Sequence, residues 1–118
     1  MTILYDLLTR DEEIFLTQSL SEIAEHYGRD HQRTKLAEEC SEFIAARIKN
    51  TLEPSPDNQD HEDDELADLV VMLEQLVSVR SGVGRKFAER VLFKVRRQLD
   101  RIEYEQSVNA ARDIEHGC

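Results

Sequence analysis

The stretch Lys35-Leu-Ala-Glu-Glu-Cys-Ser-Glu-Phe-Ile-Ala-Ala46 (KLAEECSEFIAA) places three glutamates within five residues of a pattern that is otherwise apolar with helical spacing. A second stretch, Asp64–Leu76 (DELADLVVMLEQL), also places acids among apolar residues. An amphipathic helix needs an apolar stripe to bury against a neighbour. Acids that recur beside such a stripe in two helices therefore call for a physical explanation.

The composition favours one small all-α domain. A chain of 118 residues with 40% hydrophobic residues can supply one core. A charged fraction of 34%, with only 4 Gly and 2 Pro, suits long helices better than short strands. We predict a single four-helix bundle-like domain over residues 1–118, with a core at about residues 10–106 and a C-terminal tail at 107–118.

Start and stop signals divide the chain into four predicted helices. The first covers about residues 10–27, because Thr9–Glu12 has the form of a capping box and Gly28 can end the helix. The second covers about 31–50, with Asp30 as its cap, and a loop with two prolines follows at 51–60. The third runs from near residue 62 to before 81, and the fourth from 84 or 85 to about 106.

The charge of the chain limits its partners. The formal net charge is −10, which repels nucleic-acid polymers and anionic membranes. No apolar run approaches membrane-spanning length, and no basic stretch followed by an apolar run marks a signal peptide. The two cysteines, Cys40 and Cys118, give neither a disulfide framework nor paired metal spacing. We expect a cytoplasmic protein.

Helical geometry places acids at the edges of two apolar stripes. At 100° per residue, the helix predicted at 31–50 has Glu39 at the edge of its apolar stripe and Glu42 one step farther round; the stripe contains Leu36, Cys40, Phe43 and Ile44. The helix predicted from residue 62 has Glu65 and Asp68 on the rim of its own apolar arc, which contains Leu66, Leu69, Val70, Leu73, Leu76 and Val77. Antiparallel packing through these stripes would bring the four carboxylates together.

Such a convergence needs positive charge. Like-charged neighbours on a helix cost roughly 0.2–0.5 kcal/mol each even when exposed. Mg²⁺ prefers oxygen ligands, and Mn²⁺ can take the same ones. The four acids Glu39, Glu42, Glu65 and Asp68 are therefore candidate ligands. The alternative is that they are solvated and paired with cations one turn away, as Lys35 is placed to pair with Glu39.

Other site chemistries lack their patterns. No histidine has a glutamate three residues before it, as a di-iron bundle requires, and residues 57–64 lack the glycine and glutamate spacing of a calcium loop. The predicted fourth helix concentrates basic residues, most of which suit an ordinary polar helix face; they are Arg85, Lys86, Arg90, Lys94, Arg96, Arg97 and Arg101. One or two of them could instead face a phosphate.

The two acidic motifs resemble those of a known family. Glu38-Glu39-x-x-Glu42, then 22 residues, then Glu65-x-x-Asp68, resembles the MazG-type all-α nucleoside triphosphate pyrophosphohydrolases. The flanks Gln32-x-x-Lys35-Leu-x-Glu-Glu and Ala67-Asp-x-x-x-Met-Leu-Glu-Gln-Leu76 are also similar. The resemblance covers roughly residues 20–103.

The resemblance implies a Mg²⁺-dependent enzyme that hydrolyses a nucleoside triphosphate between the α and β phosphates. It implies that Glu39, Glu42, Glu65 and Asp68 hold the ion, that Glu38 orients or deprotonates the attacking water, and that Lys35, followed by Lys94 and Arg97, contacts phosphate. It also implies a homo-oligomer, either a dimer or a dimer of dimers. The wide apolar arcs of so short a chain favour this as well.

Two other functions stay open at this point. Phosphoribosyl-ATP pyrophosphatases share the helical architecture, although the flanks are closer to the MazG type. A non-catalytic helical protein that binds cations or a partner helix is the alternative from another class. With no Trp and only 3 Tyr in the chain, the sequence does not indicate which base or sugar is preferred.

Overall fold

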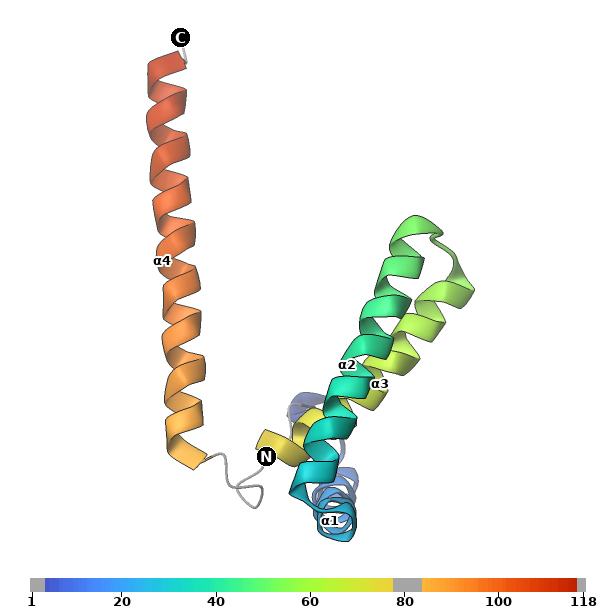
Figure 1. Ribbon diagram of the computed structural model, residues 1–118. Coiled ribbons are helices and arrows are strands. Elements are labelled where there is room, and N and C mark those ends of the chain that lie inside the picture. The colour runs from blue at the N-terminus through green and yellow to red at the C-terminus, as the bar shows by residue number, and fades with distance from the viewer. Residues whose placement is uncertain (1–3, 78–83, 117–118) are drawn as a thin grey trace. The chain divides into compact units, whose positions relative to one another are not determined.

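The computed structural model describes residues 4–77 and 84–116, and these residues are almost entirely helical (Figure 1). A short 3₁₀ helix, η1 (Tyr5–Leu7), precedes the four helices α1 (Arg10–Tyr27), α2 (Arg29–Leu52), α3 (Pro56–Val77) and α4 (Gly84–His116). No strand occurs in the described residues, so the all-α class is confirmed. Nor is any described helix long and apolar enough to cross a membrane.

The chain divides into two units. Residues 1–83 contain η1 and α1 to α3, and residues 84–118 contain α4. The predicted four-helix bundle includes α4, and it stays a prediction. Within its own unit, α4 continues beyond Gln106 as far as His116, so the described part of the predicted tail is helical.

Helix α1 has the bounds that its caps predict. The Thr9 hydroxyl accepts from the backbone N–H of Glu12 at 3.2 Å, and the Thr9 backbone N–H donates to the Glu12 carboxylate at 2.9 Å. The bond from the Thr9 backbone lowers the pKa of Glu12. The stability it contributes is present above the ordinary carboxyl pKa and is lost as the pH falls through the lowered value. Gly28 ends the helix at a φ of 86°, which glycine tolerates best.

The other predicted bounds need correction. Helix α2 starts at Arg29 and includes Asp30 in its first turn, so Asp30 is not its cap. Helix α3 starts at Pro56, six residues before the predicted position near Glu62. Proline suits the first position of a helix because its missing N–H has no partner there. Ser55 supports the start by accepting from the backbone N–H of Asn58 at 3.0 Å.

Helices α2 and α3 form an antiparallel hairpin, with the turn at its tip (Figure 1). Along each helix, one row of side chains with low exposure follows alternating spacings of four and three residues, as in coiled-coil packing. We call these two rows the seam: Gln32, Leu36, Glu39, Phe43, Ala46 and Asn50 on α2, and Asn58, Glu62, Glu65, Leu69, Met72 and Leu76 on α3.

The predicted apolar stripes coincide with the buried rows only in part, through Leu36 and Phe43 on α2 and Leu69 and Leu76 on α3. Ile44, predicted in the core, is 55% exposed, whereas Glu39, predicted at the edge, is buried. On α3, Leu66, Leu73 and Val77 are exposed, and the buried side chains are Glu62, Met72, Glu74 and Gln75. The seam therefore runs along the acidic margin of each apolar stripe and leaves much of the stripe uncovered.

A buried amide pair joins α2 and α3 at the end of the hairpin opposite the turn. Gln32 Nε2 donates to Gln75 Oε1 at 2.8 Å, and both residues are buried. We expect Gln32→Leu to destabilise the chain by about 1–3 kcal/mol, because it removes a buried donor and leaves the amide partner in place. Gln32→Leu with Gln75→Leu should cost less than the sum of the single changes. Urea unfolding of the wild type, the two single variants and the double variant measures the coupling energy between Gln32 and Gln75. Strictly additive changes in the free energy of unfolding would contradict the predicted coupling.

Candidate metal centre

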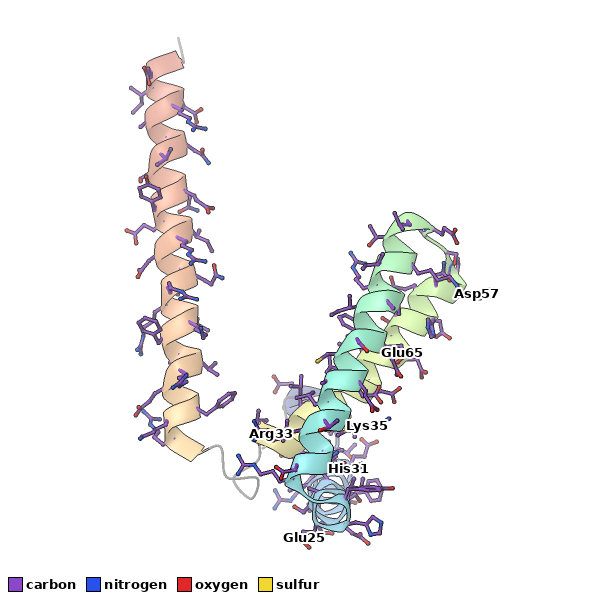
Figure 2. The ribbon with its side chains drawn as sticks, in the orientation of Figure 1. Glu25, His31, Arg33, Lys35, Asp57 and Glu65 are labelled. Carbon is purple, nitrogen blue, oxygen red and sulfur yellow. The ribbon has the colours of Figure 1, made fainter. Side chains whose placement is uncertain are left out.

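Carboxylates from both helices meet in the middle of the hairpin. Figure 2 shows Glu65 on α3 about halfway along the pair. Glu39, on the facing row of α2, is 6% exposed, and the Glu65 side chain is 15% exposed. Seam positions are fixed by packing on both sides, so the two carboxylates are held by the hairpin itself.

Three of the four predicted ligands form one group. Carboxylate oxygens of Glu39, Glu42 and Glu65 lie within 4.8 Å of one another. The fourth, Asp68, belongs to a second group of the same size, in which it joins Glu65 and Asp64. Glu65 is common to both groups and connects the acids of the two motifs.

Asp64 was not among the predicted ligands. Asp64 belongs to the acidic run at residues 60–65, and such a run is typical of a solvated helix start. The signal that could have found it is its position four residues before Asp68, which places both acids on one flank of α3.

The two buried carboxylates each have an unsatisfied oxygen. Within residues 4–77 and 84–116, Oε2 of Glu39 and Oε2 of Glu65 are buried and have no hydrogen-bond partner. Native structures rarely leave buried polar atoms unpaired, and each such atom needs an explanation. A hard cation coordinated by these oxygens would provide one, and carboxylate oxygens are the donors that Mg²⁺ and Mn²⁺ prefer. The residues present therefore fit a divalent cation.

Among the described residues, two basic side chains reach these carboxylates. Lys35 Nζ lies 3.3 Å from Oε1 of Glu39 and 3.3 Å from Oε2 of Glu38. These contacts raise the pKa of Lys35, and the hydrogen bond to Glu38 has the larger effect. Lys35 therefore keeps its positive charge. His61 Nε2 lies 3.9 Å from Oε1 of Glu65 and adds charge only when protonated. Of the lysines and arginines in the described ranges, Lys35 alone pairs with one of the five clustered acids, through Glu39.

The remaining predicted site residues lie elsewhere. Glu38 is exposed and pairs with Lys35, and the two carboxylate groups do not include it. Lys94 and Arg97 lie on α4, in the second unit, and their contact with phosphate stays a prediction.

A cavity of about 450 Å³ begins beside Lys35. Its walls come from the end of α1, the start of α2 and the end of α3, and they include Ile23, Tyr27, His31, Gln32, Lys35, Glu38 and Gln75. The rings of Tyr27 and His31 are stacked, with centroids 5.0 Å apart and planes 15° from parallel. Figure 2 shows His31 and Lys35 following one another along α2, so the aromatic side of the cavity is close to the carboxylates.

Comparison with protein-family models, curated proteins and solved structures gives no match to this chain. The resemblance to the MazG type therefore depends on the residues of the two acidic motifs and their flanks.

We expect Mg²⁺ to stabilise the folded chain. An ion at about a hundred times its dissociation constant adds about 2.7 kcal/mol to the free energy of unfolding. Glu65→Gln should remove most of this gain, and it should slightly raise the melting temperature without metal because it relieves repulsion. Glu25→Gln, on α1, is the matched control (Figure 2). Thermal unfolding with Mg²⁺ and with a chelator measures both effects, and equal Mg²⁺ shifts in all chains would contradict the assignment.

Proposed function

We propose that this chain is a Mg²⁺-dependent pyrophosphohydrolase that converts a nucleoside triphosphate to a nucleoside monophosphate and pyrophosphate. The observation that carries the proposal is the pair of buried, unpartnered carboxylate oxygens on Glu39 and Glu65, inside a cluster drawn from two helices. The type of reaction is inferred from the resemblance of the two motifs to the MazG type.

The carboxylates account for how an acidic protein holds a polyanion. Glu39, Glu42, Glu65 and Asp68 would hold the cation, and Asp64 is a fifth donor within reach of Glu65. When bound, Mg²⁺ supplies positive charge to phosphate oxygens and makes a water more acidic. Without it, the repulsion between the cluster and a triphosphate would oppose binding.

Lys35 is placed between the cluster and the cavity. Its ammonium contacts Glu39 of the carboxylate cluster, and its side chain lines the cavity. Its ammonium can exchange a carboxylate for a phosphate oxygen when a triphosphate is present. Its partner Glu38 also lines the cavity, where an exposed carboxylate can orient or deprotonate a water. Lys94 and Arg97 are proposed as further phosphate contacts.

The cavity provides a place for the nucleoside. The stacked Tyr27 and His31 rings offer an aromatic surface at its wall, beside the buried Gln32–Gln75 pair. Flat heterocycles bind by stacking on rings of this kind.

Product analysis tests the reaction. The chain is incubated with Mg²⁺ and a panel of canonical and damaged ribo- and deoxyribonucleoside triphosphates, with phosphoribosyl-ATP included, and products are separated by chromatography. We expect monophosphate and pyrophosphate. Asp68→Asn and Glu39→Gln should lower turnover by at least about a hundredfold, because metal ligation supplies several kcal/mol of transition-state stabilisation. Orthophosphate with a diphosphate, or unchanged turnover in both variants, contradicts the proposal.

Lys35→Met tests the phosphate contact separately. Loss of a charge-assisted contact worth about 1.5–3 kcal/mol lowers kcat/KM by about 10- to 100-fold. Lys35→Arg keeps the charge and should retain part of the activity. Lys49→Met, at the exposed end of the same helix, is the control and should not change kcat/KM. Equal activity of the Lys35→Met and Lys49→Met chains would contradict the proposed phosphate contact of Lys35.

A further inference from the structure

A chain of hydrogen bonds connects the backbone of α3 to the wall of the cavity. Gln75 Nε2 donates to the backbone carbonyl of Val71 at 3.2 Å. Gln32 Nε2 donates to Gln75 Oε1 at 2.8 Å, and Gln32 Oε1 lies 2.8 Å from Nδ1 of His31. Gln32 and Gln75 are 4% and 2% exposed, whereas His31 is exposed and lines the cavity. All four residues belong to the unit of residues 1–83.

The backbone carbonyl at the start of this chain sets the direction of every bond in it. A carbonyl oxygen can only accept, so the carbonyl of Val71 requires the amide nitrogen of Gln75. The amide oxygen of Gln75 then requires the amide nitrogen of Gln32, and the amide oxygen of Gln32 faces His31. Turning either amide over would oppose two acceptors in a buried place, and buried polar groups without partners are costly.

The two buried amides therefore select the tautomer of His31. Because the oxygen of Gln32 can only accept, Nδ1 of His31 carries the proton, and Nε2 of the neutral ring keeps its lone pair. Among the described residues, this Nε2 has no hydrogen-bond partner. An imidazole without such a neighbour can place its proton on either nitrogen. Here the cavity wall presents a hydrogen-bond acceptor that is fixed by the interior of the hairpin.

His31 continues a row of polar side chains along α2. Glu39, Lys35 and His31 follow one another at intervals of four residues, so they lie on one side of the helix, about 6 Å apart along its axis. In the proposed function, the cluster at Glu39 holds the cation and Lys35 contacts phosphate. The cavity extends from Lys35 to His31 and to the Tyr27 ring stacked on it, so the nucleoside lies at His31.

We propose that His31 selects the substrate by accepting, at Nε2, a hydrogen bond from a donor group of the nucleoside. Two groups of a nucleotide supply such a donor, the exocyclic amino group of the base and a hydroxyl of the sugar. Gln32 and Gln75 are positioning residues, because they act through the tautomer of His31. The inference rests on the proposed function for placing a nucleotide in the cavity, whereas the tautomer follows from the hydrogen bonds alone.

Nuclear magnetic resonance of the isotope-labelled full chain tests the tautomer without a ligand. Two-bond proton–nitrogen correlations at about pH 9, where imidazole side chains are neutral, identify the unprotonated ring nitrogen by its downfield shift. We expect Nε2 for His31, whose signals are assigned by their loss in His31→Phe. Gln32→Leu should move the proton toward Nε2. Asn50→Leu, which removes a buried amide donor at the other end of the hairpin, should not.

Two results of this measurement overturn the proposal. One is a wild-type His31 ring that carries its proton on Nε2, a result that does not depend on how any variant folds. The other is an unchanged tautomer in a Gln32→Leu chain that keeps its helical circular dichroism.

Calorimetric binding of nucleoside monophosphates to the full chain, with Mg²⁺ present, tests the recognition of the donor. Adenosine and cytidine monophosphates are each compared with the analogue that lacks the exocyclic amino group, and with the deoxy analogues that lack one sugar hydroxyl. Loss of the group that His31 recognises should weaken binding about tenfold, the effect of one hydrogen bond. In His31→Phe, which keeps a ring beside Tyr27, this difference should vanish. His26→Phe, at the ring that meets Tyr27 edge-on, is the control and should retain it.

The outcomes separate this inference from the proposed hydrolysis. Selective binding without turnover of any triphosphate would contradict the proposed function and support the recognition of the nucleoside by His31. Turnover with equal binding of every matched pair, or a difference that persists in His31→Phe, would overturn the inference and leave the proposed function standing. A chain that binds none of these nucleotides would overturn both.

Discussion

Carboxylates occupy seam positions between α2 and α3 that hydrophobic residues usually fill, and the rest of the hairpin is arranged around that constraint. Glu39 and Glu65 face one another from rows whose neighbours are Leu36, Phe43, Leu69 and Met72. Removing a carboxylate from water is costly unless it is paired or coordinated. Lys35 satisfies one oxygen of Glu39, and no group in the described part of the chain satisfies the other. The middle of the hairpin is thus the part that a bound cation would stabilise most.

Polar contacts at both ends of the hairpin fix its register. At one end, Gln32 binds Gln75 across the seam. Near the tip, Asn50 donates to Gln59 at 2.9 Å, and Arg47 pairs with Glu62 at 3.1 Å. Buried polar pairs contribute little net stability, but a shift of either helix by one turn would separate them and leave each group unsatisfied. Fixed register is what a cluster built from two helices needs, because a shift of one turn would also separate Glu39 from Glu65.

The sequence predicted the local features well and the tertiary ones only in part. The bounds of α1 follow from Thr9 and Gly28, whose effects are confined to one turn. The predicted start of α3 is wrong because two prolines indicate a loop over residues 51–60, whereas Pro56 occupies the first helical position. Part of the predicted core was wrong for a different reason. An apolar stripe shows which residues avoid water, but the neighbouring helix decides which row is buried, and a pair such as Gln32 and Gln75 leaves no local signal. The approach of Glu39, Glu42 and Glu65 was predictable because i, i+3 acids share a helix flank wherever the helix packs.

The position of the seam relative to the apolar stripes decides where the carboxylates of the proposed site lie. If the seam ran along the centre of each stripe, Ile44, Leu66 and Leu73 would be buried within the hairpin, and the carboxylates would be solvated at its rim. The observed rotation brings Glu39 and Glu65 inward and turns those apolar residues outward. The rotation of the two helices therefore creates a carboxylate cluster that a bound cation would stabilise.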